Sequence, residues 1–501
     1  RRISTLSDSE IMSSEKEIIL NDGQKAALNS LMGFLRDKEA RVFVLKGYAG
    51  TGKTTLVRKL ISFMEARKIR YGLLASTGRA AKVLGDVTGH QAQTIHSQIY
   101  RFRGFNADAK KVKDENSLER EGLQLVINFS LGTPDPDSPE VYVIDEASMI
   151  SDSVEKVVVQ SKFGNGRLLS DLLAYDEKAK FIFVGDPCQL APVTGEQCPA
   201  LCPEYFKEHF DIDAQDAELR QVMRQDGDNG IVGAASEIRE LWEEAPEDTL
   251  PYGSVNHWEK LPFRYVPNIE LLRSVDVLAS KYLSDVRGGN YGNAVFISRS
   301  NTGCYNFSLK FRDSLGYSGP LQPGELLLVV QNNLVSGLRN GDLVIVKNIS
   351  PASEFRAGLS FREIEVEELY TGEKFRQLMI DDILYQPQPN LGTQQQGRLY
   401  SDFIIRMRKK GISDDDERFH DLMRADKYLN ALRVSFGYAL TCHKAQGGEW
   451  TNVYAYFPRN IMLNPTKQDY QWVYTAMTRA QEKFFVVDDI YIEGYRYGFG
   501  H

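Results

Sequence analysis

Seven short apolar runs, each four or five residues long and separated by helix-like stretches, constrain the fold of this 501-residue chain more than any other feature. An apolar run of this length, bounded by turn residues, is typical of a strand that is buried on both faces of a sheet. Strands that alternate with helices predict parallel sheets. Because the runs fall into an early and a late group, the sequence predicts two α/β domains. The runs are residues 42–45, 72–75, 141–144, 181–184, 295–298, 453–457 and 484–487.

Two stretches interrupt this alternation. Residues 98–138 carry a basic, aromatic segment and then a run with period-two alternation at 123–129, which predicts a β-hairpin inserted in the first domain. Residues 348–432 carry β-like pieces, a Gln-rich loop and a charge run, which predict a β-rich insert in the second domain. We therefore expect a flexible tail at 1–20, a first domain at 21–205 that contains the hairpin, and a second domain built from 206–347 and 433–501.

Composition and charge narrow the class of protein. The net charge of -8 argues against a protein that is held to nucleic acid by bulk charge, although it leaves room for a local basic groove. No apolar run approaches the roughly 20 residues that span a bilayer. Five cysteines in so long a chain favour a reducing compartment such as the cytoplasm over a disulfide scaffold. Cys198 and Cys202 could form half of a zinc site, but no second pair of ligands follows at zinc spacing. We therefore expect them to be ordinary small side chains and not metal ligands.

A glycine-rich loop at residues 47–54 lies between an apolar run and a helix-like stretch. Glycines in this context let backbone N–H groups face phosphates at the positive end of the following helix. Lys53 is expected to reach the β- and γ-phosphates, and the Thr54 hydroxyl is expected to bind Mg²⁺. The residues expected to bind the nucleotide here are Gly47, Ala49, Gly50, Thr51, Gly52, Lys53, Thr54 and Thr55.

Two later strands are also predicted to end in polar residues. The run at 141–144 delivers Asp145 and Glu146, which we expect to hold Mg²⁺ through water and to polarise the attacking water. An Asp-Glu pair alone is weak evidence for such a site. It is strong evidence when it comes some ninety residues after a phosphate loop and fits the same sheet. The run at 181–184 leads to Gln189, whose side-chain amide can sense a γ-phosphate or its water. Alternatively, Gln189 is an amide in a loop without a role in catalysis. Together these features predict an ATP-hydrolysing site.

The late motifs at 438–450 and 474–480, with the junction segment at 219–225, resemble those of the superfamily 1 helicases. The resemblance is to the B-type, in the group that contains RecD and the phage helicase Dda. It runs from about residue 21 to residue 487 and rests on at least seven motifs in the family's order. It implies two RecA-like parallel-sheet motor domains, the first with a β-hairpin insert (the pin) and the second with an SH3-like insert at 348–432.

The resemblance also assigns roles around the nucleotide. Gln24 matches the adenine-reading glutamine, and Glu449 resembles the residue that contacts the ribose. Arg224 and Arg479 match the arginines that reach the γ-phosphate from the second domain, where a cationic side chain stabilises the charge of the transferring phosphoryl group. Surface salt bridges are the alternative for both arginines. ATP and Mg²⁺ are the expected cofactors.

Further motifs resemble elements that contact a single strand of DNA, largely without reading its sequence. The residues concerned are Thr77, Arg79, His96, Asn301, Thr441, His443 and Lys444. His96 and His443 could instead be satisfied core histidines. Phe102, Phe105 and Phe129 in the hairpin are candidates for a pin tip that stacks on a separating base pair, and packing in the core is the equal alternative.

The expected function is that of an ATP-dependent 5′-to-3′ DNA helicase, and the direction follows from the resemblance alone. Residues 188–192, which match the family's third motif, lack the tryptophan that A-type relatives carry there. This agrees with a B-type motor. Alternatives are a translocase or RNA remodeller that does not unwind DNA, and a motor subunit of a nuclease or recombination complex. We expect a monomer that acts on single strands and junctions beside single-strand-binding, replication or recombination proteins.

Overall fold

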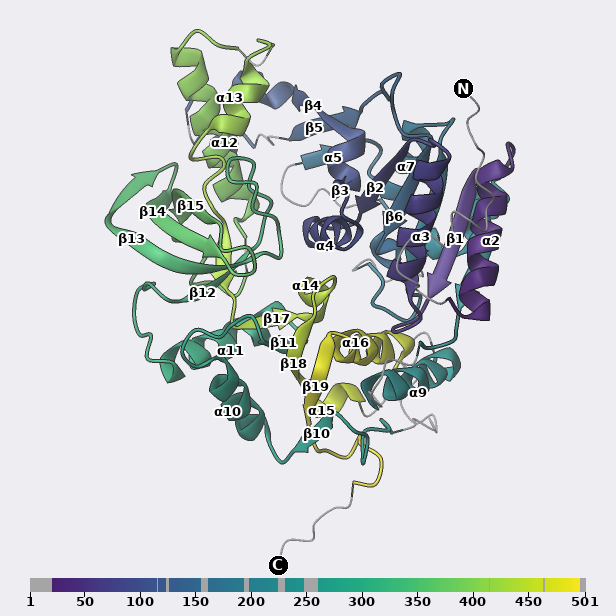
Figure 1. Ribbon diagram of the computed structural model, residues 1–501. Helices are drawn as coiled ribbons and strands as arrows, with labels where there is room; N and C mark the ends of the chain where they lie inside the picture. Colours follow the sequence, from purple (N-terminus) through teal and green to yellow (C-terminus); the bar gives the residue numbers. More distant parts are fainter. Residues whose placement is uncertain are drawn as a thin grey trace, which may run out of the picture. The chain divides into compact units, whose positions relative to one another are not determined.

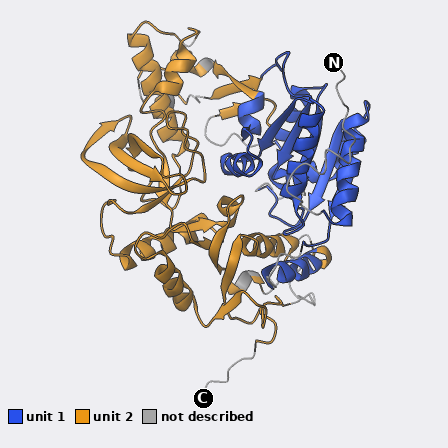
Figure 2. Ribbon diagram, in the orientation of Figure 1, with its two compact units in different colours: residues 1–99, 132–154, 167–242 blue, residues 100–131, 155–166, 243–501 orange. Residues whose placement is uncertain are grey.

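The computed structural model describes residues 20–114, 116–122, 126–154, 161–192, 198–223, 230–246, 260–388, 390–413, 415–462 and 465–495. The chain divides into two compact units, shown in different colours in Figure 2. The first comprises residues 1–99, 132–154 and 167–242, and the second comprises 100–131, 155–166 and 243–501. The tail expected at 1–20 lies outside the described residues except for Leu20.

The described part of the first unit contains a six-stranded parallel sheet in the order β3-β2-β6-β8-β1-β9 (Figure 1). The four early apolar runs form its four central strands, as strands buried on both faces require. The strands are β1 (Val42–Gly47), β2 (Tyr71–Ala75), β3 (Ala92–Thr94), β6 (Val141–Asp145), β8 (Lys180–Gly185) and β9 (Gln215–Leu219).

Helices cover both faces of this sheet. Alternate side chains of its strands, such as Phe43 and Ile182, join the core cluster with α2, α3 and α4. On the other face Phe183 packs on Phe206 of α8, with ring centroids 5.3 Å apart. The helices of the unit are α2 (Asp22–Arg36), α3 (Lys53–Ala66), α4 (Gly78–Thr88), α5 (Ile95–Ile99), α7 (Leu168–Tyr175), α8 (Pro203–Phe210) and α9 (Gly230–Glu244), with short 3-10 turns η2 (Ala147–Met149) and η3 (Pro199–Leu201).

The edge strand β9 lies beyond the domain boundary expected at residue 205. It pairs in parallel with β1, with Gly47 opposite Leu219. Because β9 is an edge strand, its residues alternate between exposed and partly buried positions instead of forming an apolar run. The first unit therefore extends through β9 and into α9, as far as Trp242.

The second unit contains a parallel sheet whose described strands lie in the order β10-β19-β18-β11-β17. The three late apolar runs form its centre. On one face Tyr282 of α10 packs on Phe296 of β11 and on Phe311 of α11. The strands are β10 (Ile269–Leu272), β11 (Ala294–Ser298), β17 (Ala439–Thr441), β18 (Trp450–Tyr456) and β19 (Ala480–Val487), and the helices are α10 (Val275–Val286), α11 (Asn301–Ser314), α14 (Cys442–Ala445), α15 (Arg459–Met462) and α16 (Lys467–Met477).

A five-stranded antiparallel sheet in the order β15-β14-β13-β12-β16 forms the β-rich part of the second unit. It is wider than the expected insert at 348–432, because β12 and β16 flank that range and pair with each other. Its elements are β12 (Leu326–Val329), β13 (Leu343–Arg356), β14 (Leu359–Glu368), β15 (Lys374–Ile380), α12 (Thr393–Lys409), α13 (Phe419–Ala425) and β16 (Val434–Phe436). None of the described helices of the chain is long and apolar enough to cross a membrane.

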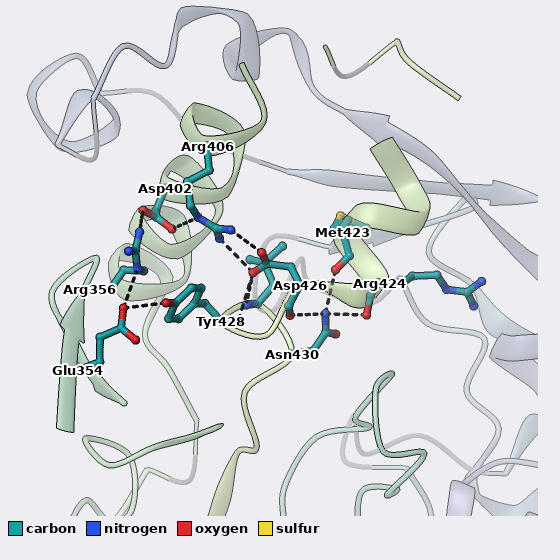
Figure 3. A network of polar contacts seen from close by, with 10 residues as sticks. Glu354, Arg356, Asp402, Arg406, Met423, Arg424, Asp426, Tyr428 and Asn430 are labelled. Atoms are coloured by element: carbon teal, nitrogen blue, oxygen red, sulfur yellow. Dashed lines mark hydrogen bonds and ion pairs between the residues drawn. The ribbon is translucent and has the colours of Figure 1, made fainter. Parts of the chain in front are cut away.

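A network of charged side chains fixes α12 to this antiparallel sheet (Figure 3). The Asp402 carboxylate, 4% exposed, accepts from Arg356 at 3.0 Å through one oxygen and from Arg406 at 2.7 Å through the other. Arg406 also donates to Asp426 at 3.0 Å, and the Tyr428 hydroxyl donates to Glu354 at 2.7 Å. Because the buried Asp402 carboxylate has two arginine partners, the cost of removing it from water is offset.

The remaining described strands form a small sheet in the order β4-β5-β7. β4 and β5 pair antiparallel, with Phe102 opposite Phe129, and β7 adds a parallel partner to β5. Arg408 of α12 donates to the carbonyl oxygens of Ala109, at 2.7 Å, and Val112. The elements are β4 (Tyr100–Phe105), η1 (Ala107–Lys111), α6 (Ser117–Arg120), β5 (Ile127–Leu131) and β7 (Ser161–Phe163).

Candidate functional site

The candidate nucleotide site lies at the carboxyl edge of the first sheet. β1, β6 and β8 end at Gly47, Asp145 and Gly185, and the register pairs Lys46 with Gly185. Since all strands of the sheet are parallel, the polar residues that follow these three strands converge on one edge. Of the sequence-predicted residues, Asp145 ends its strand here, and Lys53 and Gln189 follow strands that end here.

The phosphate loop has a backbone that only glycine adopts without strain. Gly50 and Gly52 have φ angles of 71° and 81°. A Cβ atom on Gly52 would lie 2.3 Å from Nε2 of Gln24, and one on Gly47 would lie 2.7 Å from Cγ of Lys53. The Thr51 hydroxyl closes the loop by donating to the Tyr48 carbonyl at 2.7 Å. The loop is therefore tightly packed before α3 begins at Lys53.

Gln24 packs directly against this loop from α2. It is 1% exposed, and its Nε2 donates to the Thr51 carbonyl at 3.0 Å. Its Oε1 accepts from the Asn21 amide at 3.1 Å, which completes a capping box at the start of α2. Both ends of its amide thus support the local structure beside the loop.

The Lys53 side chain folds back over the loop. Its Nζ donates to the Gly47 carbonyl at 2.7 Å and to the Tyr48 carbonyl at 3.1 Å, and it lies 3.9 Å from Oδ2 of Asp186. Asp186 is fully buried, and its Oδ1 accepts from the Cys188 amide at 3.0 Å. Sequence reasoning gave Asp186 no role, although its position just after a buried strand was a usable signal.

Asp145 is the last residue of β6, and Glu146 follows it. Glu146 has φ 51° and ψ 42°, a left-handed conformation that costs a non-glycine residue about 1–2 kcal/mol. This turn lets the Glu146 amide donate to Oδ1 of Asp145 at 2.9 Å. Burial raises the pKa of Asp145, against the Glu146 amide and the Lys53 ammonium, which lower it. Strained backbone of this kind is typical of functional sites.

Gln189 occupies the loop after β8. It is 5% exposed, and its backbone amide donates to the Asp186 carbonyl at 3.2 Å. Its buried Oε1 has no hydrogen-bond partner among the described residues. An unsatisfied buried oxygen costs about 1–3 kcal/mol, so this atom is a natural acceptor for a ligand.

The first unit also carries three of the expected strand contacts. Thr77 caps α4, where its hydroxyl oxygen accepts from the Ala80 amide at 3.2 Å. Arg79 in the first turn of α4 is only 9% exposed. His96 lies in α5, and burial lowers its pKa, which favours the neutral ring. Thr77 and His96 follow β2 and β3, so both lie toward the carboxyl edge.

In the second unit, three of the expected strand contacts line one pocket. Asn301, Thr441 and Lys444 share it with Cys304 and Gln386, among others. The register places Ser298 opposite Thr441, so the segments that follow β11 and β17 meet at the carboxyl edge of this sheet. The sequence did not indicate Cys304 or Gln386, because they come from segments outside the recognised motifs.

Helix caps shape this pocket. The Ser300 hydroxyl oxygen accepts from the Gly303 amide at 3.0 Å at the start of α11, and Thr441 accepts from the Lys444 amide at 3.4 Å at the start of α14. Burial lowers the pKa of Lys444. Burial also raises the pKa of the Cys304 thiol to about 12, so the thiol is neutral. His443 is adjacent in sequence but does not line the pocket.

Arg479 and Glu449 lie near one another in the second unit. Arg479 is 7% exposed, and its guanidinium donates to the carbonyl oxygens of Thr475 at 3.1 Å and Gly448 at 3.4 Å. Glu449, the next residue, is exposed and accepts from Gln481 at 3.2 Å. Arg224 lies outside the described residues.

The three pin candidates contact other aromatic rings. Phe102 stacks on His420 with ring centroids 4.6 Å apart and an interplanar angle of 5°. Phe129 stacks on Phe163 at 4.6 Å. Phe105 lies edge-on to Tyr400 and Phe419, at 5.7 and 6.0 Å. These contacts support the packing alternative for all three side chains.

Comparisons with known proteins match both halves of the chain. An AAA domain model matches residues 19–248, and a UvrD-like helicase C-terminal domain model matches residues 436–487. Together with the parallel sheets and the phosphate loop, these matches agree with the class of the superfamily 1 helicases. The resemblance drawn from the motifs is thereby confirmed.

Within that class the chain is similar to RecD and Dda relatives. The ATP-dependent RecD2 DNA helicase of Deinococcus radiodurans is 26% identical over 478 residues, which cover 93% of this chain and 48% of the relative. The ATP-dependent DNA helicase dda of Enterobacteria phage T4 is 27% identical over 222 residues, which cover 44% of this chain and 42% of the relative. The chain thus spans about half the length of these relatives. The RecBCD enzyme subunit RecD of Buchnera aphidicola is 19% identical over a match that covers 90% of this chain and 71% of the relative.

Proposed function

We propose that this chain is an ATP-dependent DNA helicase that moves 5′ to 3′ on single-stranded DNA and separates duplex. The observation that carries the proposal is the carboxyl edge of the first sheet, where Lys53, Asp186 and Gln189 gather around a glycine-rich loop. A half-buried lysine beside the buried Asp186 carboxylate, with the unsatisfied amide oxygen of Gln189 in the loop after the same strand, suits phosphate chemistry.

At this edge, Lys53 binds the β- and γ-phosphates of ATP, and the backbone of the loop cradles them. Glu146 polarises the attacking water, and Gln189 positions it or senses the γ-phosphate. The oxygen ligands of Thr54 and Asp145 fit Mg²⁺, because Mg²⁺ prefers hydroxyl and carboxylate oxygens. By resemblance, Gln24 reads the adenine, Glu449 contacts the ribose, and Arg479 and Arg224 stabilise the γ-phosphate during transfer.

The pocket of the second unit binds the single strand. Asn301, Thr441 and Lys444 offer an amide, a hydroxyl and an ammonium to a phosphate, and none of these reads a base. Thr77, Arg79 and His96 supply a second contact region, at the edge of the first sheet. Binding should therefore depend little on DNA sequence.

The RecD-like relatives also favour a second function, that of a motor subunit which moves on a single strand without unwinding by itself. The similarity to a RecBCD enzyme subunit over 90% of this chain supports that alternative. The direction of movement is taken from the RecD and Dda group. Free thiols on all five cysteines fit a cytoplasmic place of action.

Strand displacement on tailed duplexes tests the proposal. We expect ATP-dependent displacement from a duplex with a 5′ single-stranded tail, and little from the same duplex with a 3′ tail or with blunt ends. Preference for the 3′ tail would overturn the polarity. Hydrolysis that single-stranded DNA stimulates, without displacement on either tail, would favour the motor-subunit alternative.

A further inference from the structure

The pocket proposed to bind DNA in the second unit is built from two parts of that unit. Asn301, Thr441 and Lys444 belong to α11, β17 and α14, which surround the parallel sheet. Gln386 and Pro387 belong to the segment between β15 and α12, in the β-rich part. The resemblance assigns strand contacts to the first group alone, although the second group lines the same pocket.

The segment that carries Gln386 starts from a fixed point on the antiparallel sheet. The Asp381 carboxylate pairs with Arg362 of β14 at 2.8 Å, and the Asp381 amide donates to the Ser360 carbonyl at 2.9 Å. The Asp382 carboxylate accepts from the Ser360 amide at 2.6 Å. Both acidic residues are thus bound to β14, which holds the start of the segment to the sheet.

Tyr385 fixes the next part of the segment from other directions. Its hydroxyl oxygen accepts from the Leu321 amide at 2.8 Å, and its backbone carbonyl accepts from the Tyr305 hydroxyl at 3.0 Å. Its ring lies edge-on to Phe436, with ring centroids 5.9 Å apart. Tyr305 belongs to α11, whose first residue is Asn301. The Tyr305 hydroxyl therefore ties the backbone of the segment to a helix that also lines the pocket.

The Gln386 side chain brings a hydrogen-bond donor to the pocket. It is partly buried, and its Nε2 donates to the Asp382 carbonyl. An amide nitrogen carries two hydrogens, so this bond leaves the second one for an acceptor. Asn301 and Lys444 line the same pocket with donors of their own, and no acidic residue is among its described lining residues. A ligand rich in acceptors, such as a phosphate group, fits this set of donors.

We propose that Gln386 is a further contact of the single strand, and that Tyr305 is its positioning residue, acting through the Tyr385 carbonyl. The inference rests on the proposed function, since it concerns the same pocket. It adds a contact from the β-rich part to those of the parallel-sheet part, so both parts of the second unit hold the strand. Because Gln386 is uncharged, its contact adds to affinity without the counterion release that a cation causes.

The Tyr305 hydroxyl can be removed with little other change. Phenylalanine keeps the ring, and Tyr385 lies at the exposed surface, where water can hydrate its carbonyl. Folding should therefore lose little, whereas the segment loses its tie to α11. The net worth of one hydrogen bond corresponds to about two- to tenfold in an equilibrium constant, which sets the size of the expected effect.

Single-strand binding by Gln386→Ala, Tyr305→Phe and the double variant tests the proposal. The probe is a fluorescently labelled oligothymidylate, and anisotropy gives its affinity at several salt concentrations. Each single variant should bind it about two- to tenfold more weakly. The double variant should bind within about twofold of Gln386→Ala, because Tyr305 acts only through Gln386. The slope of log affinity against log salt should keep its wild-type value in all three variants.

DNA-stimulated ATP hydrolysis separates this role from a general loss of structure. The DNA concentration that half-stimulates hydrolysis should rise by the same factor as the dissociation constant. The maximal rate should stay within about twofold of wild type, because the variants affect binding alone. Gln386→Glu keeps the size of the side chain but presents a carboxylate to the phosphates, so it should bind DNA more weakly than Gln386→Ala.

The matched controls make the same changes away from the pocket. In Tyr291→Phe the lost hydroxyl donates to the Gly324 carbonyl at 3.2 Å. In Gln322→Ala the lost amide donates to the Ser318 carbonyl at 2.7 Å, four residues earlier, as Gln386 does in its own segment. Neither control residue is among the described lining residues of the pocket, so both variants should bind DNA as the wild type does.

Three results would overturn the proposal. Gln386→Ala could bind the single strand as tightly as the wild type. The double variant could lose the product of the two single effects, which would show that Tyr305 does not act through Gln386. The controls could weaken binding as much as the pocket variants, which would make the effect structural. A wild type that binds no single strand would contradict the proposed function as well, whereas any of the three results with normal wild-type binding contradicts the Gln386 contact alone.

Discussion

The two parallel sheets end in carboxyl edges of different chemistry. The edge of the first sheet gathers an ammonium and two carboxylates: Lys53 lies 3.9 Å from the buried Asp186, and Asp145 ends β6. The pocket at the edge of the second sheet is lined by Asn301, Thr441 and Lys444, and no carboxylate is among its described lining residues. Under the proposed function, similar architecture therefore suits two kinds of ligand, and the residues that follow each strand decide which.

This difference agrees with what the two proposed ligands require. Phosphoryl transfer requires negative groups that hold a metal and activate water, together with a cation for the phosphates. A DNA backbone is only bound, so a carboxylate beside it would repel the phosphates. Uncharged donors and one lysine are sufficient there. The comparison predicts that changes at the first edge affect hydrolysis, and that changes at the second affect DNA affinity.

The largest effect should come from Lys53→Ala at the first edge. Loss of the ammonium removes the charge that stabilises the transferring phosphoryl group, so ATP hydrolysis should fall by about 10²–10³-fold or more. Arg58→Ala on the exposed side of the same helix is the matched control and should leave hydrolysis unchanged. Steady-state phosphate release measures both. Full activity in Lys53→Ala would exclude this edge as the hydrolytic site.

A pair of glycine substitutions compares the two edges directly. In Gly52→Ala the new Cβ would lie 2.3 Å from Nε2 of Gln24, at a positive φ angle, so the phosphate loop must distort. In Gly303→Ala the new Cβ would lie 2.6 Å from the Ser298 hydroxyl, at the start of α11, whose Asn301 and Cys304 line the pocket. At Gly52 the left-handed backbone costs a side chain about 1–2 kcal/mol, which corresponds to roughly tenfold in affinity. At Gly303, in the first turn of α11, the cost comes instead from displacing the Ser298 hydroxyl.

Nucleotide and single-strand binding, measured on both variants by fluorescence titration, should separate the two edges. Gly52→Ala should weaken nucleotide binding, and Gly303→Ala should weaken DNA binding. If each variant weakened both ligands equally, the division of chemistry between the edges would be wrong.

Lys444→Gln should have a smaller effect. It removes one cation from a pocket that keeps Asn301 and Thr441, so the DNA concentration that half-stimulates hydrolysis should rise about three- to tenfold. The slope of log affinity against log salt should also fall by about 0.7, the value for one contact with a single strand. Lys310→Gln, at an exposed position of α11, is the control. An unchanged salt slope would remove Lys444 from the DNA contacts.

The sequence predicted the centres of both parallel sheets, because strands buried on both faces must be apolar. It did not indicate the edge strands β9 and β17, since short or half-exposed strands carry no apolar run. The phosphate loop and the acidic pair after β6 were recognisable because each is local in sequence. The proposed function was inferred from these motifs together with their order along the chain.

The features that the sequence did not predict depend on contacts between distant segments. The approach of Asp186 to Lys53 follows from the pairing of β1 with β8, which are more than a hundred residues apart. Likewise, the sequence left the hairpin phenylalanines undecided between core and tip, because Phe102 stacks on His420 in a distant helix. No local pattern could give either contact.

The smallest predicted effect concerns pH, and it has opposite signs at the two edges. Burial raises the pKa of Asp145, so this carboxylate takes up a proton at a higher pH than an ordinary aspartate. Binding of Mg²⁺ and nucleotide should therefore weaken as the pH falls. Burial lowers the pKa of Lys444, so its charge is lost at a lower pH than in an ordinary lysine, and DNA binding should weaken as the pH rises.

Titrations of nucleotide and single-strand affinity from mildly acidic to alkaline pH would measure both effects. The acidic limb is the loss of nucleotide affinity at low pH, and the alkaline limb is the loss of DNA affinity at high pH. Lys444→Arg should abolish the alkaline limb, because a guanidinium stays charged throughout this range. Asp145→Asn should abolish the acidic limb while lowering affinity at neutral pH. If the alkaline limb persisted in Lys444→Arg, another group would control DNA binding, and the contrast between an acidic first edge and a cationic second edge would lose its titratable basis.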